Sequence, residues 1–139
     1  MKKIKKLFLL LLVTLMVACS QTPQSQAEKA AVNFSKAMYS LKFDEAKKYC
    51  TPDAYKILSF VASNVKQQDL DLLKKSGDVD VSVIESTMGQ GDSTATVNLK
   101  ISNYIQLNMM SGKSIIEKEK NEKVCLVKVK DKWLVDLLK

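Results

Sequence analysis

The stretch CLVKVKDKWLVDLL, residues 125–138, decides the fold of this chain because it describes a β-hairpin. Asp131 and Lys132 are expected to form the tight turn between two apolar strands. After this turn, apolar side chains at every second position give the last strand one buried face: Trp133, Val135 and Leu137. Before the turn, a long strand is predicted over residues 115–130. The hairpin therefore predicts an antiparallel sheet with one covered face.

Two more strands are predicted upstream of the hairpin, because apolar residues again occupy every second position. They cover residues 79–83 and 95–101, and turns are expected at residues 89–92 and 110–113. The middle of the long strand, residues 117–123, is charged on both faces, so we expect it to overhang into solvent or to form an edge. The four strands are expected to pair as an antiparallel meander.

Helices are predicted before the strands. In the first helix, apolar side chains recur at helical spacing: Ala30, Phe34, Ala37, Met38 and Leu41. A short second helix over residues 43–49 begins with Asp44 as its cap. Thr51, followed by Pro52, opens a third helix, and Gly77 ends it. About three helices followed by a four-stranded antiparallel sheet make an α+β arrangement.

The N-terminal segment has the three regions of a bacterial secretion signal. Residues 1–6 are basic, and residues 7–17 are apolar apart from one threonine, a run too short to cross a membrane as a helix. The sequence MVAC at residues 16–19 resembles the lipobox of bacterial lipoproteins, with Met where Leu is usual. We therefore expect residues 1–18 to be a signal peptide and the Cys19 thiol to be lipidated. An ordinary secretory signal, with Cys19 as a bystander, is the alternative.

The residues after Cys19 indicate where the anchored domain lies. By resemblance to envelope sorting signals, Ser20 in place of Asp favours the outer membrane of the bacterial cell envelope. Residues 21–26 lack the acidic cluster that exports some lipoproteins to the cell surface, so a domain that faces the periplasm is expected. Residues 19–26 are predicted to be the lipidated cysteine and a flexible tether. Residues 27–139 are predicted to form a single α+β domain.

The charge of the chain argues against nucleic acid as a partner. The formal net charge is +7, but four lysines belong to the predicted signal peptide, so the processed chain carries about +3. All the basic residues are Lys, and they are interspersed with acids. Nucleic-acid surfaces usually cluster their basic side chains and include Arg. We therefore expect the membrane, through the lipid on Cys19, and an unidentified ligand or envelope protein as partners.

The sequence contains no catalytic constellation. It has no His, which is the commonest general base and metal ligand. Gly89 and Gly91 lie between two predicted strands, where they mark a hairpin turn and not a phosphate-binding loop. We therefore predict no catalytic residue, no metal and no cofactor.

Two cysteines, Cys50 and Cys125, remain once Cys19 is lipidated. An even pair in an oxidising compartment is compatible with a disulfide. The alternative is two separate buried thiols that act as small apolar side chains, because Cys125 shares a strand face with Val127 and Val129. Both interpretations stay open at this point.

Two segments, LKFDEAKKYCTPDAYKIL (residues 41–58) and the hairpin of residues 125–138, resemble the nuclear transport factor two-like superfamily. More narrowly, the chain resembles a domain family of unassigned function that is common among small lipoproteins of Bacteroidetes-type bacteria. The resemblance covers roughly residues 27–138. It implies a curved sheet that wraps a long helix into a cone, whose mouth often holds a ligand. The side chains that could line such a pocket are Tyr39, Tyr55, Tyr104 and Trp133.

The function that these features favour is non-enzymatic binding of a small apolar ligand, a peptide or a partner protein. The alternative is an isomerase or dehydratase-like enzyme, because ketosteroid isomerase-like members of the superfamily use Tyr and Asp residues inside the cone. Asp136, on the last strand, is a candidate carboxylate, although no catalytic motif matches. A buried carboxylate or phenol with a perturbed pKa would favour the enzyme, and a purely apolar pocket would favour binding.

Overall fold

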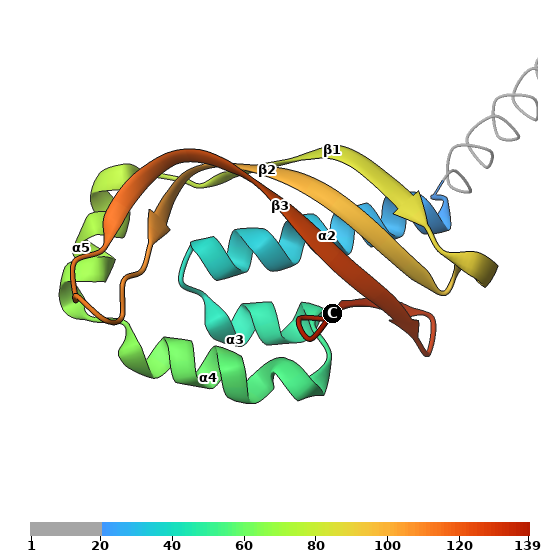
Figure 1. Ribbon diagram of the computed structural model, residues 1–139, viewed down its shortest axis with the longest axis horizontal. Coiled ribbons are helices and arrows are strands. Elements are labelled where there is room, and N and C mark those ends of the chain that lie inside the picture. The colour runs from blue at the N-terminus through green and yellow to red at the C-terminus, as the bar shows by residue number, and fades with distance from the viewer. Residues whose placement is uncertain (1–20) are drawn as a thin grey trace, which may run out of the picture.

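The computed structural model of the chain describes residues 21–139 (Figure 1). The predicted signal peptide and Cys19 lie outside these residues. The helices are α2 (Pro23–Tyr39), α3 (Phe43–Ala46), α4 (Tyr55–Asn64) and α5 (Gln67–Ser76), and the strands are β1 (Asp80–Met88), β2 (Thr94–Gln106), β3 (Ile115–Val129) and β4 (Lys132–Val135). Short 3₁₀ turns cover Lys47–Tyr49, Pro52–Ala54 and Gln90–Asp92. Among the described residues, no helix is both long and apolar enough to cross a membrane.

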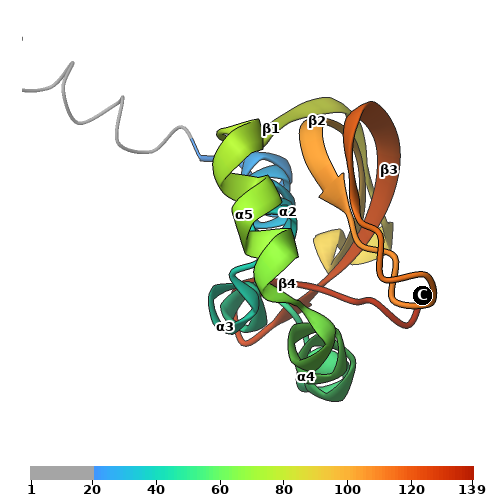
Figure 2. The same cartoon turned by 90° about the vertical axis from the view of Figure 1, so that its left-hand side faces the viewer.

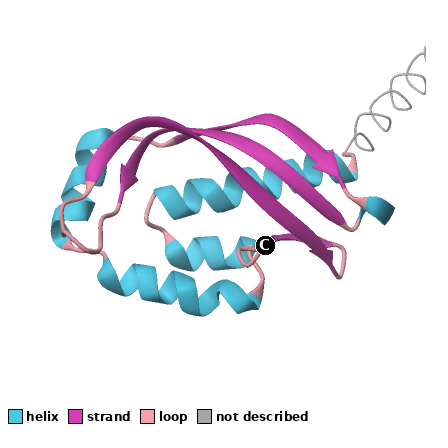
Figure 3. Cartoon of the chain, viewed as in Figure 1, coloured by secondary structure: helices cyan, strands magenta, loops and turns pink. Residues whose placement is uncertain are grey.

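The four strands form one antiparallel sheet in the order β1-β2-β3-β4. Figure 1 and Figure 3 show the sheet arching over α2, with α3 and α4 on the other side of that helix. Helix α5 stands at one end of the arch, as the turned view in Figure 2 also shows. The predicted α+β class and the predicted four-stranded meander are therefore confirmed.

Helix α2 begins earlier than the sequence predicts. The Thr22 hydroxyl caps the helix by accepting a backbone N–H of the first turn at 3.1 Å, and Pro23 occupies the first helical position, where no N–H is needed. The first turn also contacts the sheet, since the Gln24 side-chain amide donates to the Ser86 hydroxyl at 2.7 Å. The tether predicted over residues 19–26 is therefore wrong from Pro23 onward, because these residues are helical, although their side chains are exposed.

The predicted third helix is two helices. Val65 is extended between α4 and α5, and the Lys66 backbone N–H donates to the Asp69 carboxylate at 2.8 Å, which caps a new helix start. The apolar stripe is weakest at this point, at Gln67 and Gln68, so little packing favours a continuous helix. Helix α5 therefore turns away from α4 and packs against β2.

The core lies between α2 and the inner, concave face of the sheet. Strand β2 contributes four buried side chains at alternate positions: Ala95, Val97, Leu99 and Ile101. Helix α2 contributes Ala27, Ala31, Phe34 and Ala37. Because three of these four helix residues are alanines, the helix can approach the sheet closely. A cavity remains next to the C-terminal half of α2.

Candidate functional site

A cavity of about 380 Å³ lies under the sheet, next to the C-terminal half of α2. Its walls are mostly apolar: Phe34, Met38, Leu41, Phe43, Val61, Ile105, Leu107 and Leu137. The polar part of its lining is Ser35, Tyr39, Tyr104, Gln106, Lys120 and Glu122. Apolar walls with a few convergent polar groups are the usual composition of a small-molecule site.

Four of the polar side chains form one group, which we call the polar cluster: Tyr39, Tyr104, Lys120 and Glu122. The Tyr39 hydroxyl donates a hydrogen bond of 2.6 Å to Glu122 Oε2. The rings of Tyr39 and Tyr104 meet edge to face, with centroids 5.3 Å apart and planes at 69°. Lys120 Nζ lies 4.5 Å from the Tyr39 centroid, 5.1 Å from the Tyr104 centroid and 3.7 Å from Glu122 Oε2.

Strand alternation explains why Lys120 and Glu122 face the cavity. Val124 is buried on the inner face of β3, and every second residue of a strand shares a face. Going back along β3, Glu122 pairs with Leu99 and Lys120 pairs with Ile101, and both partners are buried on the inner face of β2. The two charged side chains are therefore placed by the same alternation that builds the core.

The charged segment over residues 117–123 is only in part as the sequence predicts. Strand β4 pairs with β3 only from Leu126 to Val129, so residues 117–123 form an edge of the sheet, one of the two expected alternatives. The other alternative, an overhang into solvent, is wrong for Lys120 and Glu122, which line the cavity and contact the tyrosines. Period-two alternation extended back from Val124 is the signal that could have identified them.

Asn103 explains how Tyr104 comes to line the cavity. Asn103 has a φ of 57°, in the left-handed region that Asn tolerates better than most residues. Its side-chain amide donates to the backbone carbonyls of Ser76 and Asp78, at 2.5 and 3.1 Å. The kink interrupts the alternation of β2, so that Tyr104 and Ile105 are both buried. A single kink leaves no periodic signal in the sequence.

Burial controls the acid-base state of both tyrosines. Burial, followed by the hydrogen bond to Glu122 and the charge of Glu122, raises the pKa of Tyr39 above its ordinary value of 10.0. Burial, followed by the charges of Glu117 and Glu122, also raises the pKa of Tyr104. Both side chains are therefore neutral phenols at physiological pH. They can donate hydrogen bonds and present uncharged ring faces.

The structure brings together two of the four side chains predicted to line a pocket. Tyr39 and Tyr104 line the cavity. Tyr55 does not, because it begins α4 on the solvent side and is 40% exposed. Trp133 does not either, because it is buried in the core at the β4 end of the sheet. Asp136 is also outside the lining, and its carboxylate accepts a nearby backbone N–H at 3.1 Å.

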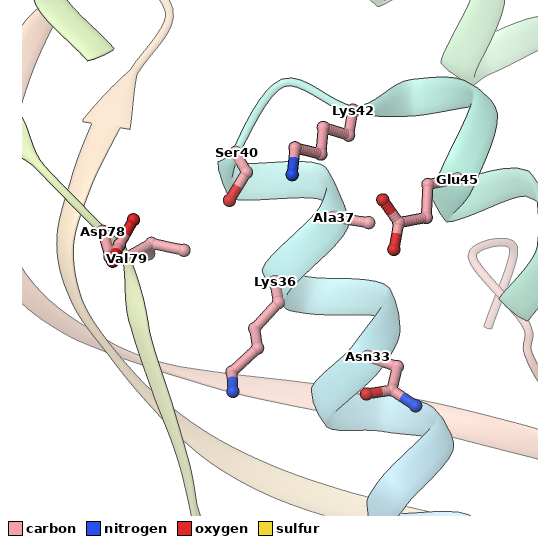
Figure 4. A pocket seen from close by; sticks show the side chains of 8 residues that line it. All are labelled: Asn33, Lys36, Ala37, Ser40, Lys42, Glu45, Asp78 and Val79. Carbon is pink, nitrogen blue, oxygen red and sulfur yellow. The ribbon is translucent and has the colours of Figure 1, made fainter. Parts of the chain in front are cut away.

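A second pocket, of about 360 Å³, lies between α2, α3 and the segment that leads into β1 (Figure 4). Its lining has mixed charge, since Lys36 and Lys42 share it with Glu45 and Asp78. Figure 4 shows the amino groups of the two lysines pointing in different directions, so they do not converge on one ligand group. Across residues 21–139, no group of three or more Cys, Asp or Glu residues is arranged to hold a metal ion.

The thiols of Cys50 and Cys125 are free in this structure. Cys50 is buried in the core, whereas Cys125 lies between the inward-facing Val124 and Leu126, so alternation turns its side chain to the outer face of the sheet. The disulfide interpretation is therefore not supported by this structure, because the sheet separates the two side chains. Burial raises the pKa of Cys50, despite the opposing charge of Lys47, and so disfavours a reactive thiolate.

The fold and the cavity define an α+β domain whose curved antiparallel sheet covers a helix and a mixed apolar and polar cavity. A scan against protein-family models and a search of curated proteins gave no match. Among solved structures, the chain is similar to a Campylobacter jejuni protein described as a "Putative NTF2-like transpeptidase". The TM-score is 0.49 and the identity 24%, over 79% of this chain and 96% of that one. It is also similar to the intermembrane space region of the chloroplast protein ARC6, with a TM-score of 0.47 and 13% identity, over 78% of this chain and 92% of that one.

The α+β class and the strand order rest on the structure of this chain itself. The narrower resemblance, to lipoproteins of Bacteroidetes-type bacteria, stays a prediction.

Proposed function

We propose that this chain is an envelope lipoprotein whose domain binds a small ligand without catalysing a reaction. In this proposal the lipid on Cys19 holds the domain at the outer membrane, facing the periplasm, and the cavity under the sheet holds the ligand. The cavity is the observation that supports the binding role, because its volume of about 380 Å³ lies within the range of small-molecule sites. A cavity of this size favours a small molecule over a peptide or a partner protein.

The lining of the cavity indicates an amphipathic ligand rather than a purely apolar one. Phe34, Met38 and Leu107 offer apolar surface that would stabilise a hydrocarbon part of the ligand by burial. A purely apolar ligand, however, would cover Lys120 and Glu122 without giving either charge a new partner, and burying charges in this way is unfavourable. A ligand with one polar end satisfies both parts of the lining.

Several observations favour binding over catalysis. General acid-base catalysis works best when the pKa of the catalytic group lies near the working pH, and burial moves the pKa of Tyr39 and Tyr104 further from neutrality. The Tyr39 proton is also already engaged in the hydrogen bond to Glu122. Asp136, the carboxylate considered from the sequence, does not line the cavity.

A proton-transfer enzyme is the second candidate function, and Glu122 is the observation that favours it. A carboxylate beside a half-buried phenol is a feature expected of an enzyme and not of a purely apolar site. In this role Glu122 would act as the base, and Tyr104 would donate a hydrogen bond to the developing oxyanion. A screen of the purified chain against ketosteroid-like and other proton-transfer substrates tests this candidate. Turnover that is abolished by Glu122→Gln, with the fold intact, would replace the binding proposal.

Co-purification tests the binding role directly. The full chain is purified from bacterial cells under mild conditions, and the molecules bound to it are extracted and identified by mass spectrometry. Val61→Trp should fill the cavity because Val61 lines it, whereas the adjacent Ala62 does not line the cavity but a neighbouring surface pocket beside α3. We expect a bound molecule with the unchanged chain and with Ala62→Trp, but not with Val61→Trp. If the bound molecule were recovered equally from all three proteins, or from none of them, the cavity would not be the binding site that we propose.

A further inference from the structure

The polar cluster has the geometry of an aromatic cage around an organic cation. The cation is the Lys120 ammonium, whose Nζ lies 4.5 and 5.1 Å from the centroids of the Tyr39 and Tyr104 rings. Glu122 Oε2 supplies a negative charge 3.7 Å from the same nitrogen. A cation within about 6 Å of a ring centroid is attracted by the negative face of the ring, and sites for methylated ammonium groups are built in this way.

The cage walls are held in place independently of the cation. Tyr104 is buried, and its ring packs edge to face against that of Tyr39. The hydrogen bond from Tyr39 to Glu122 joins the second ring to the carboxylate. Because none of these contacts involves Lys120, the walls should persist when its ammonium group leaves.

Lys120, in contrast, is a replaceable occupant of the cage. It lies on the part of β3 that forms an edge of the sheet, and its side chain is 36% exposed. A lysine stem is long and flexible, so the ammonium group can move into solvent without any change in the strand. Its departure leaves two ring faces and one carboxylate without the cation that they surround.

An anionic ligand fits the same cluster less well. The charge of Lys120 is already compensated by Glu122 at 3.7 Å. A ligand carboxylate that approached Lys120 in the cavity would therefore meet the like charge of Glu122, which also lines the cavity.

We propose that the cavity binds an amphipathic amine, whose ammonium group displaces Lys120 from the cage of Tyr39, Tyr104 and Glu122. The apolar part of the ligand then lies along the apolar walls of the cavity. Lys120 acts as an internal competitor, which keeps the cage filled in the absence of ligand and lowers the affinity for the incoming amine. This inference rests on the proposed binding function and names the chemical class of its ligand.

Three probes with the same six-carbon chain and different head groups test the inference: hexyltrimethylammonium, 1-hexanol and hexanoate. The full chain, purified in lipid nanodiscs, is titrated with each probe by nuclear magnetic resonance, with empty nanodiscs as the blank. We expect the ammonium probe to bind most tightly. Lys120→Ala should strengthen its binding by about tenfold, because the internal competitor is removed, and should leave 1-hexanol nearly unchanged. Lys100→Ala is the matched control, since Lys100 pairs with Glu119 at 3.2 Å on the outer face of the sheet.

Variants of the cage walls should have the opposite effect. Glu122→Gln preserves the size of the side chain but removes its charge, and Tyr39→Leu removes one ring face. Each should weaken the binding of hexyltrimethylammonium by roughly threefold or more and leave 1-hexanol nearly unchanged. Glu122→Gln carries this test alone if Tyr39→Leu does not fold.

The possible outcomes separate the inference from the proposed function. If hexanoate binds most tightly and Lys120→Ala abolishes its binding, the cluster is an anion site, and the inference is wrong while the binding function stands. The inference is also wrong if all three probes bind equally well, since apolar burial alone would then explain binding. If none of the probes binds, the inference is wrong, and the proposed function stands or fails on the co-purification experiment.

Discussion

The hydroxyl of Tyr39 donates a 2.6 Å hydrogen bond to Glu122 across 83 positions of the chain. Tyr39 is the last residue of α2, and Glu122 lies in the middle of β3. The bond therefore fastens the end of the buried helix to the edge region of the sheet. Because both side chains also line the cavity, the same contact contributes to the stability of the fold and to the shape of the site.

Tyr39→Phe should lower the free energy of unfolding by about 1 to 2 kcal/mol. The substitution preserves the ring but removes a hydrogen bond to a charged, half-buried acceptor. Tyr55→Phe is the matched control because Tyr55 is 40% exposed, and its effect should stay within about 0.5 kcal/mol. Denaturant unfolding of the two variants measures the difference. Equal losses would show that the bond to Glu122 adds nothing to stability.

Alkaline pH should destabilise the domain through the half-buried Tyr39 and the buried Tyr104. In the folded chain the pKa of Tyr39 and that of Tyr104 are raised above the ordinary value of 10.0. Above about pH 10 the unfolded chain therefore releases protons that the folded chain keeps, so the free energy of unfolding falls as the pH rises. Below this pH both states are protonated, and these groups cause no pH dependence.

Chemical denaturation on both sides of pH 10 tests this prediction. The decrease in stability at alkaline pH should be smaller in Tyr39→Phe and in Tyr104→Phe, because each variant lacks one of the phenols. Tyr55→Phe should keep the behaviour of the unchanged chain. If the decrease were the same in all four proteins, the phenols of Tyr39 and Tyr104 would not be its source.

The strands could be predicted because their signal is local and regular. Alternating apolar residues identify β2, and the turn at Asp131 identifies the hairpin of β3 and β4. The break between α4 and α5 could not be predicted in the same way. It depends on the Asp69 carboxylate, which accepts the Lys66 backbone N–H and caps the start of α5, and not on any periodic pattern of apolar residues. Pro23 is an equally ambiguous signal, because proline is common both in flexible tethers and at the first position of a helix.

The candidate site was harder to predict because it depends on contacts between distant residues. The kink at Asn103 brings Tyr104 next to Tyr39, and no repeat in the sequence marks it. Charged residues are normally excluded from an inner face, so the sequence predicts a solvent overhang or a sheet edge for residues 117–123 and no cavity lining for Lys120 and Glu122. Their position becomes understandable once their ion pair and the Tyr39 hydrogen bond are known, since both compensate the cost of partial burial.

The packing of β2 against α2 predicts which leucines hold the domain together. Leu99 is completely buried on the inner face of β2, so Leu99→Ala should lower the free energy of unfolding by about 2 to 5 kcal/mol by leaving a cavity. Leu138 is 61% exposed, and Leu138→Ala should change stability by less than about 0.5 kcal/mol. Thermal and denaturant unfolding compare the two variants. A small effect of Leu99→Ala would show that the core is assigned to the wrong face of the sheet.

The two sides of the sheet should give Cys50 and Cys125 different reactivities. Cys50 is buried and its pKa is raised by burial, whereas Cys125 is only half-buried on the outer face. We expect a thiol-alkylating reagent to modify Cys125 first and to reach Cys50 only under denaturing conditions. Peptide mapping without reduction measures both the sites of labelling and any disulfide. Recovery of the two cysteines in one linked peptide pair would instead establish the disulfide that the sequence left open.

The membrane anchor should depend on Cys19 alone among the three cysteines. The lipobox-like sequence MVAC at residues 16–19 presents one thiol to which a diacylglyceryl group can be attached, and several acyl chains are needed for stable anchoring. Cys19→Ala should therefore abolish the incorporation of labelled fatty acid and leave the chain uncleaved by the lipoprotein pathway. Cys50→Ala should keep both processes, since Cys50 is buried in the folded domain. Labelling with radioactive palmitate, followed by mass spectrometry of the N-terminal peptide, distinguishes the variants. If Cys19→Ala took up as much label as the unchanged chain, the lipid would be attached elsewhere and the proposed anchor would be wrong.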